Sequence, residues 1–316
     1  MTGESGNSTF RVADGPVAVT PTRESGRARV AARTQNALTI DVEDYFQVQA
    51  FADIIDRSQW DAIAPRVEAN TERALELFDA GGAKATFFTL GWVAERYPAL
   101  IRRIVAEGHE LASHGMAHIR ADSQDRAEFD ADIRRAKELL EDAGGVEVRG
   151  YRAATFSIGR SNMWAYESLA EAGYHYSSSI YPVSHDLYGL PDASRDPFHP
   201  AGDNGVVEIP MSTLRMAGRN FPASGGGYFR LLPYPVYRWM VAQLNGREGR
   251  PCIFYFHPWE IDPDQPRQDN ATFRSRFRHY TGLERMAGKL GRLLEDFSWS
   301  RMDAVYHDVI ANRQRS

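Results

Sequence analysis

In the stretch TIDVEDYF, residues 39–46, an apolar run ends and three carboxylates follow within four positions. They are Asp41, Glu43 and Asp44. Carboxylates this close together raise one another's pKa unless a cation lies among them, and a divalent metal ion would remove the repulsion. In an extended strand Asp41 and Glu43 point to the same side, whereas Asp44 points away or begins the turn. The competing interpretation is a solvated strand end whose acids cap the next helix. The pattern indicates a metal-binding carboxylate group or a helix cap.

The stretch SHGMAH supplies a second candidate group, because His114 and His118 are four residues apart. On a helix, residues at i and i+4 share a face, so the two imidazoles could converge on one metal ion. A carboxylate from elsewhere would complete a three-ligand site with a position left for water. The chain has nine histidines, so the spacing alone is weak evidence, and packed histidines are the alternative.

Two further candidates lie at the ends of strand-like runs. His257 ends the aromatic run in FYFHPWE, and Arg152 closes the run in GYRAATFS. In α/β barrels, active sites are assembled at the carboxyl ends of the strands. Arginine does not give up its proton at neutral pH, so its expected role is to hold a carboxylate ionised and oriented. For a lone histidine, a packed or surface position is the commoner alternative.

Short apolar runs with strand character alternate with helical runs from about residue 36 onward. Such alternation implies a parallel sheet, and this many units favour closure into a barrel over an open sheet. The expected strands are ALTIDV, KATFFTL, HELASH, VRGYRA, YHYSSSI, VVEIP and CIFYFH. The expected helices are ERALELFDAGG, WVAERYPALIRRIVAEG, residues 124–142, 162–172 and 236–244, and LERMAGKLGRLLEDF.

Length and composition narrow the class of protein. A chain of 316 residues with 43% hydrophobic residues can form one large α/β barrel, and a net charge of -5 gives no basic footprint for nucleic acid. Cys252 is the single cysteine, which excludes an intrachain disulfide. No transmembrane run of about 18 apolar residues and no secretion signal are visible, which favours a cytoplasmic location. Residues 1–35 are polar and small, and we expect a disordered arm there.

Other chemistries find little support. Ser224 precedes three glycines but lacks the G-x-S-x-G context of a serine esterase. No G-x-x-x-x-G-K-[ST] loop occurs, which excludes a P-loop site. The aromatic residues between 228 and 239 could stack on sugar rings or form core, and Glu208 could support an active site or be satisfied locally.

The stretches TIDVED, SHGMAH, GYRAATFS, YHYSSSIYP and FYFHPWE occur in the order of the motifs of polysaccharide deacetylases. The chain thus resembles carbohydrate esterase family 4 with its NodB homology domain, and an ordered set is more specific than any single motif. The stretches DVEDYFQV, GGGYFRLLPY and FHPWEIDPDQP resemble the subgroup linked to exosortase and PEP-CTERM exopolysaccharide clusters. The resemblance implies a distorted (β/α)7-type barrel over residues 36–260 and a subgroup-specific C-terminal extension, residues 261–316, packed on the barrel.

By this resemblance, we expect a metal-dependent hydrolase that removes N-acetyl groups from hexosamine units of an exopolysaccharide or its precursor. The substrate would be an N-acetylated polysaccharide or oligosaccharide. Asp41 matches the general base of the family, and His257 matches the general acid. Arg152 matches the arginine that orients the base.

The resemblance also implies a divalent metal ion, with Zn²⁺ as the expected ion. His114 and His118 match the two histidine ligands. Glu43 matches the carboxylate ligand of a D-x-D variant of the first motif, and its parity with Asp41 along a strand favours it. Asp44, which directly follows Glu43, is the alternative carboxylate.

Two positions depart from the family pattern. Ala154 stands where proline is usual, and Ser177 stands where aspartate is frequent. Neither change removes an expected ligand or the expected base, but each could alter substrate contacts. Two alternative functions therefore stay open at this point: an allantoinase-like hydrolase of a small cyclic amide or ureide, and a non-catalytic glycan-binding barrel.

Overall fold

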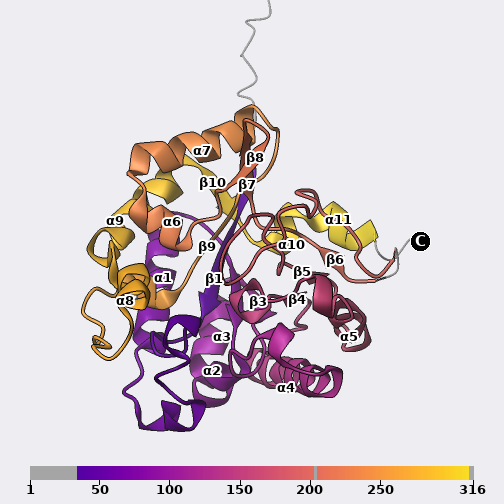
Figure 1. Ribbon diagram of the computed structural model, residues 1–316, viewed down its shortest axis with the longest axis vertical. Coiled ribbons are helices and arrows are strands. Elements are labelled where there is room, and N and C mark those ends of the chain that lie inside the picture. Colours follow the sequence, from indigo (N-terminus) through magenta and orange to yellow (C-terminus); the bar gives the residue numbers. More distant parts are fainter. Residues whose placement is uncertain (1–33, 203–204, 313–316) are drawn as a thin grey trace, which may run out of the picture. The chain divides into compact units, whose positions relative to one another are not determined.

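The computed structural model describes residues 34–202 and 205–312. The arm expected over residues 1–35 lies outside these residues except for its last two, and Gln35 already begins the first strand. Within the described part, strands and helices alternate along the chain in the order that the sequence predicts, and the helices surround the sheet (Figure 1). The predicted α/β class is thereby confirmed.

The strands differ greatly in length, and only β1 is long. Seven of the eight residues of β1 are buried, which agrees with its near-continuous apolar sequence. The strands are β1 Gln35–Val42, β2 Thr86–Thr89, β3 Glu110–Ser113, β4 Gly150–Tyr151, β5 Tyr176–Ser177, β6 Val207–Glu208, β7 Thr213–Met216, β8 Arg219–Pro222, β9 Ile253–Phe256 and β10 Ser298–Ser300.

The expected helices are present with one correction. The run WVAERYPALIRRIVAEG forms two helices rather than one, because Pro98 has no N–H to donate and disfavours helical geometry at Tyr97 before it. None of the described helices is long and apolar enough to cross a membrane. The helices are α1 Val67–Ala80, α2 Gly91–Arg96, α3 Pro98–Ala106, α4 Arg126–Gly144, α5 Ala165–Glu171, α6 Gly226–Leu231, α7 Tyr234–Gly246, α8 Phe273–Tyr280, α9 Leu283–Asp296, α10 Met302–Val305 and α11 His307–Asn312.

The main sheet is parallel and curls into an incomplete barrel in the order β9-β1-β2-β3-β4-β5-β6. Among the described residues no ladder joins β6 to β9, so the ring stays open there. The open edge of β9 is nevertheless satisfied, because Tyr255 N–H donates to the carbonyl of Ser224 at 2.7 Å and Ile253 N–H donates to Ser212 Oγ at 2.8 Å. These acceptors flank the antiparallel hairpin β7–β8, which the sequence did not predict.

The strand β10 is a second addition to the predicted fold. Its residues Ser298–Ser300 pair in parallel with Gln35–Ala37 of β1, although more than 250 residues separate the two segments. Trp299 is buried and donates its indole N–H to the carbonyl of Leu293 at 2.9 Å.

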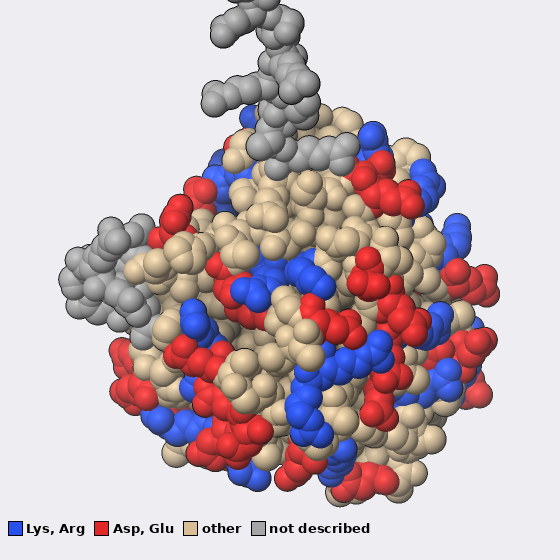
Figure 2. All heavy atoms as spheres, turned by 180° about the vertical axis from the view of Figure 1, so that it is seen from behind, with Lys and Arg blue, Asp and Glu red and all other residues tan. Residues whose placement is uncertain are grey.

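On the face shown in Figure 2, acidic and basic side chains are interspersed, in keeping with the modest net charge.

The buried carboxyl of Glu110 joins three parts of the fold. It accepts hydrogen bonds from Tyr176 Oη at 2.8 Å, from Thr86 Oγ1 at 2.5 Å and from the N–H of Asp303 at 3.2 Å. Burial, followed by the negative charge of Asp303, raises the pKa of Glu110 from 4.5 to about 7.

This shift predicts a pH dependence of stability. A carboxyl whose pKa is higher in the folded state stabilises the fold fully below pH 4.5, and the contribution is lost as the pH rises towards 7. The side chain of Glu110→Gln cannot ionise. Between pH 5 and pH 8 we therefore expect the melting temperature of this variant to fall by less than that of the native protein. Thermal unfolding followed by circular dichroism measures this, and parallel pH profiles of the two proteins would contradict it.

Candidate active site

Three side chains that could hold a metal ion meet at the carboxyl ends of β1 and β3. Glu43 follows β1 and His114 follows β3, and these parallel strands both pair with β2, so their ends lie at the same edge of the sheet. His118 is the third member. The candidate ligand atoms of Glu43, His114 and His118 all lie within 4.8 Å of one another, and all three residues are buried.

The two histidines converge by a route that differs from the predicted one. The segment after Ser113 is a loop rather than a helix, so the shared helical face was wrong. Gly115 and His118 both adopt positive φ angles, of 77° and 51°, which fold the loop back on itself. The imidazole centroids of His114 and His118 consequently lie 5.4 Å apart. A strained φ at a histidine is typical of a functional loop.

The donor set and its hydrogen bonds fit a divalent cation. His118 Nε2 lies 2.9 Å from Glu43 Oε2, yet among the described residues Glu43 Oε2 has no hydrogen-bond partner. Two buried ligand atoms this close together suit a shared cation. His114 donates its Nδ1–H to the carbonyl of Arg152 at 2.8 Å, which orients the ring and leaves Nε2 for a metal. Two imidazoles and one carboxylate are a usual set for catalytic zinc.

The environment also favours the protonation states that metal binding needs. Burial opposes ionisation of Glu43, but the imidazoles of His118 and His257 outweigh it, and the pKa of Glu43 falls to about 2. Burial lowers the pKa of His114 to about 4, in spite of the nearby charge of Asp41. Glu43 is therefore an anion and His114 a neutral imidazole at neutral pH, as ligands must be.

Asp44, the alternative carboxylate, points elsewhere. Its Oδ2 accepts hydrogen bonds from the N–H groups of Arg66 at 2.7 Å and Val67 at 2.9 Å, where α1 begins, and its Oδ1 accepts from Tyr45 N–H at 2.8 Å. Asp44 thus satisfies free donors at a helix start. Both interpretations of TIDVEDYF describe real features, but they describe different residues: Glu43 joins the histidines, and Asp44 caps a helix.

Asp41 and Arg152 form a buried ion pair beside the three candidate ligands. Arg152 is completely buried, and its Nη1 donates to Asp41 Oδ1 at 2.6 Å and to Thr39 Oγ1 at 2.8 Å. Its Nε donates to the carbonyl of Ser178 at 3.1 Å, and its guanidinium lies 4.0 Å from the ring centroid of Phe88. These contacts hold the carboxylate of Asp41 in one orientation.

His257 lies on the other side of Glu43 and is held by a second carboxylate. Its Nδ1–H donates to Glu260 Oε1 at 2.8 Å, and its Nε2 lies 3.6 Å from Glu43 Oε1. Burial by itself would lower the pKa of His257, but the charges of Glu43 and Glu260 outweigh it and raise the pKa to about 9. A proton on His257 is therefore stabilised by carboxylates on both sides.

Glu260 and Arg230 are site residues that the sequence reasoning missed. Arg230 is buried and donates from Nε to Glu260 Oε2 at 2.6 Å. Its other guanidinium nitrogens donate to the carbonyls of Arg278, His279 and Thr281 at 2.7–2.8 Å. The spacing in HPWE was a usable signal, because a residue at the start of a helical turn and a Glu three positions later commonly hydrogen-bond. Arg230 gives no such local signal.

The positions that depart from the family pattern lie just behind the site. Ala154 is buried and begins a short helical turn in which Thr155 has a φ of 56°. Ser177 donates its hydroxyl to Ser179 Oγ at 2.8 Å. Glu208 accepts from the N–H groups of Ser179 and Ile180 and from Tyr166 Oη, which satisfies it locally and answers the question that its sequence left open.

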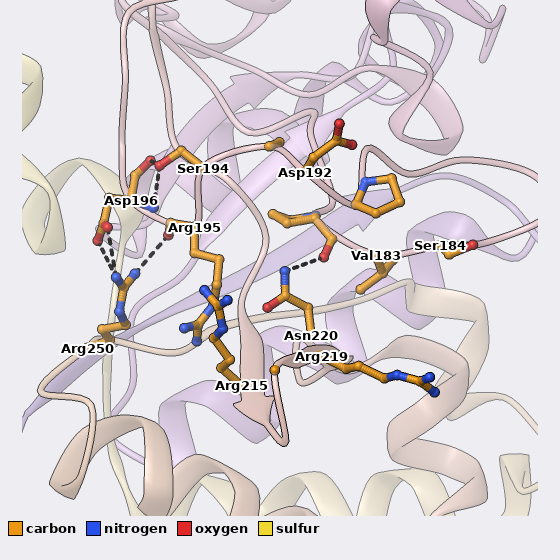
Figure 3. Close-up of a pocket in the computed structure, with 14 residues that line it drawn as sticks. Val183, Ser184, Asp192, Ser194, Arg195, Asp196, Arg215, Arg219, Asn220 and Arg250 are labelled. Atoms are coloured by element: carbon orange, nitrogen blue, oxygen red, sulfur yellow. Dashed lines mark hydrogen bonds and ion pairs between the residues drawn. The ribbon is translucent and has the colours of Figure 1, made fainter.

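The candidate site does not coincide with a large cavity elsewhere in the described residues. That cavity, of about 740 Å³, is lined by the 182–196 segment and the hairpin β7–β8, and contains none of the predicted site residues (Figure 3). Arg250 reaches Asp196 across one end of it, and Asn220 donates to the carbonyl of Pro182. A smaller cavity of about 490 Å³ includes Tyr255 and Trp259, the neighbours of His257.

Comparison with known families identifies the barrel. Residues 57–177 match the model of the polysaccharide deacetylase family. This part of the chain is therefore similar to polysaccharide deacetylases. The match includes His114, His118 and Arg152, whereas Asp41 and Glu43 precede it. Residues 178–307 match a domain of unknown function, DUF3473, which contains His257 and Glu260.

Individual curated deacetylases resemble parts of this chain. A chitooligosaccharide deacetylase of Bradyrhizobium sp. (strain ANU 289) is 31% identical over 108 residues, which are 34% of this chain and 49% of the relative. A peptidoglycan-N-acetylglucosamine deacetylase of Bacillus cereus is 34% identical over 71 residues, 22% of this chain and 33% of the relative. The matched regions thus span half or less of these curated relatives.

A solved structure supports the fold over most of the chain. A Mycobacterium smegmatis protein, provisionally assigned as a polysaccharide deacetylase, superposes with a TM-score of 0.58 at 20% identity, covering 89% of this chain and 92% of its own. This likeness confirms the predicted NodB-like barrel architecture.

The different contacts of Glu43 and Asp44 predict different losses on substitution. We expect Zn²⁺ to raise the melting temperature of the native protein and of Asp44→Asn, but not that of Glu43→Gln, which loses a candidate ligand. Without metal, Asp44→Asn should be less stable by about 1 kcal/mol, the usual scale for a helix cap. Differential scanning fluorimetry with and without Zn²⁺ distinguishes the two, and a Zn²⁺ response lost only in Asp44→Asn would reverse the assignment.

Proposed function

We propose that the protein is a metal-dependent hydrolase that removes N-acetyl groups from hexosamine units of a glycan. The observation that carries the proposal is the meeting of Glu43, His114 and His118 within 4.8 Å, next to an arginine-held carboxylate and a carboxylate-held histidine. The matched family and the names of the relatives support the same reaction class. The substrate we propose is an exopolysaccharide or its precursor, from the resemblance of DVEDYFQV and GGGYFRLLPY to the exosortase-linked subgroup.

Glu43, His114 and His118 would hold the metal ion, with Zn²⁺ as our choice because two imidazoles and a carboxylate suit it. A divalent ion bound there would lower the pKa of a water molecule and would polarise the carbonyl group of the acetamide. Arg152 has a role here as well as at Asp41, since its carbonyl fixes the ring of His114.

Asp41 is the proposed general base. Arg152 donates to its Oδ1, which orients the carboxylate and leaves Oδ2 to accept a proton from the attacking water. Thr39 and Ser178 hold the guanidinium in turn, so the base cannot swing away. A fixed acceptor lowers the entropic cost of reaching the transition state.

His257 is the proposed general acid. Glu260 holds Nδ1–H, so that Nε2, on the side of the ring that faces Glu43, can give a proton to the departing amine. The stacking of the His257 ring on Trp259, with centroids 5.1 Å apart, keeps the imidazole in this plane. The products are acetate and a free amino sugar.

The first test is acetate release from N-acetylglucosamine oligomers, combined with metal analysis. We expect His114→Ala to lose both bound metal and turnover. Asp41→Asn should keep the metal and lose about 10²- to 10⁴-fold in rate, the scale of an acid–base group. Asp53→Asn, which changes an exposed carboxylate outside the candidate site, is the matched control. Full activity of Asp41→Asn would show that Asp41 is not the general base. Release of acetate without any metal would contradict the proposed metal site.

A second test addresses the carboxylate behind His257. We expect Glu260→Gln to lower kcat by about 10- to 100-fold, the scale seen for partners that orient a site histidine, while bound metal and KM change little. Glu284→Gln, an exposed residue on α9, is the control. Steady-state kinetics with melting temperatures separates this effect from unfolding, and an unchanged kcat would show that His257 does not need Glu260.

A further inference from the structure

The cavity of about 490 Å³ adjoins the proposed general acid. Tyr255 and Trp259 belong to its wall, and their rings lie 5.7 Å and 5.1 Å from the ring of His257. Trp259 also donates its indole N–H to Glu43 Oε1 at 3.3 Å. A glycan whose acetamide reached the candidate metal ligands would therefore place a neighbouring sugar unit at this cavity.

The cavity walls suit a sugar ring. Tyr188, Tyr228 and Phe277 present aromatic surface to it, and Phe277 is half exposed although it is a large apolar side chain. Tyr188 is held in place by stacking on His185, with centroids 4.0 Å apart. Aromatic rings with polar tips offer both an apolar face and hydrogen bonds, and the volume lies within the range of about 300–1,000 Å³ usual for small-molecule sites.

The charges at the cavity do not cancel. Arg278 donates to both oxygens of Asp186, at 2.9 Å and 3.1 Å, and Arg274 reaches the same carboxylate at 2.6 Å. Two guanidinium groups thus share one negative charge. The third arginine of the wall, Arg230, is already neutralised by Glu260. One positive charge is left over at the cavity, in a protein whose net charge is -5.

We propose that this cavity binds a carboxylate-bearing sugar unit next to the N-acetylhexosamine, so that the substrate is an acidic glycan. The proposal rests on the deacetylase function proposed above and names its substrate class. The planar guanidinium groups of Arg274 and Arg278 match the geometry of a carboxylate. The cavity residues after 177 lie outside the polysaccharide deacetylase match, within the region that matches DUF3473.

Titration calorimetry of the full chain with two hexasaccharides tests the ligand class. Hyaluronan hexasaccharide alternates N-acetylglucosamine with glucuronate, whereas chitin hexasaccharide is neutral, and EDTA prevents metal-dependent turnover of either ligand. We expect the acidic ligand to bind more tightly and its advantage to shrink as NaCl rises, since salt screens a partly exposed charge. Equal affinity for both ligands would overturn the proposal.

Charge variants around Asp186 test the residues. We expect Arg274→Gln and Arg278→Gln each to weaken hyaluronan binding by about two- to fivefold, the scale of a partly exposed ion pair. Asp186→Asn should strengthen it, because both arginines are then free for the ligand. Arg276→Gln is the control, since Arg276 lies on the same helix, α8, but does not line this cavity. Weakening by Asp186→Asn, or by Arg276→Gln alone, would contradict the assignment.

Acetate assays on the same two ligands, with Zn²⁺ in place of EDTA, separate this proposal from the deacetylase function. Acetate release without any preference for the acidic ligand would leave the function standing and overturn the cavity assignment. Preferential binding of the acidic ligand that depends on Arg278, with no acetate released from either ligand, would support the cavity and overturn the function.

Discussion

The guanidinium of Arg152 is completely buried, and it cannot shed its proton to escape the cost of desolvation. The structure must therefore surround it with acceptors, and it does so with Asp41, Thr39 and Ser178. This requirement ties the carboxyl end of β1 to the segments that follow β4 and β5. It also orients the ring of His114 through the Arg152 carbonyl, so both the proposed base and a proposed ligand depend on one buried cation.

A second line of buried charge runs from Glu43 through His257 and Glu260 to Arg230. Along this line, acids alternate with bases, so each charge lies between partners of opposite sign, and Arg230 ends the line at backbone carbonyls around the C-terminal end of α8. Breaking such a chain leaves an uncompensated charge in the interior. The part of the chain after residue 260 thereby helps to hold the proposed acid, and its helices α8 and α9 lie close to α6, which carries Arg230 (Figure 1).

The sequence predicted the alternation of strands and helices, and the family match over residues 57–177 confirms the likeness to polysaccharide deacetylases for the motifs that it contains. Strand parity, a local property of an extended chain, favoured Glu43 over Asp44, and it is Glu43 that lies close to the two histidines. The loop route of His118, with its positive φ, leaves no periodic signal. Arg230 pairs with a residue 30 positions away, and such a contact is decided by tertiary packing alone.

The pairing of β10 with β1 has a consequence for how this chain acquires its structure. The strand β1 completes its hydrogen bonds only with residues 298–300, so the first of the described strands to be synthesised has to wait for the last of them. Contacts of such long sequence separation slow folding, because a large loop must close before they form. During synthesis β1 is thus without its full set of neighbouring strands, and its apolar side chains stay exposed to solvent. Chaperone binding would protect them during that time.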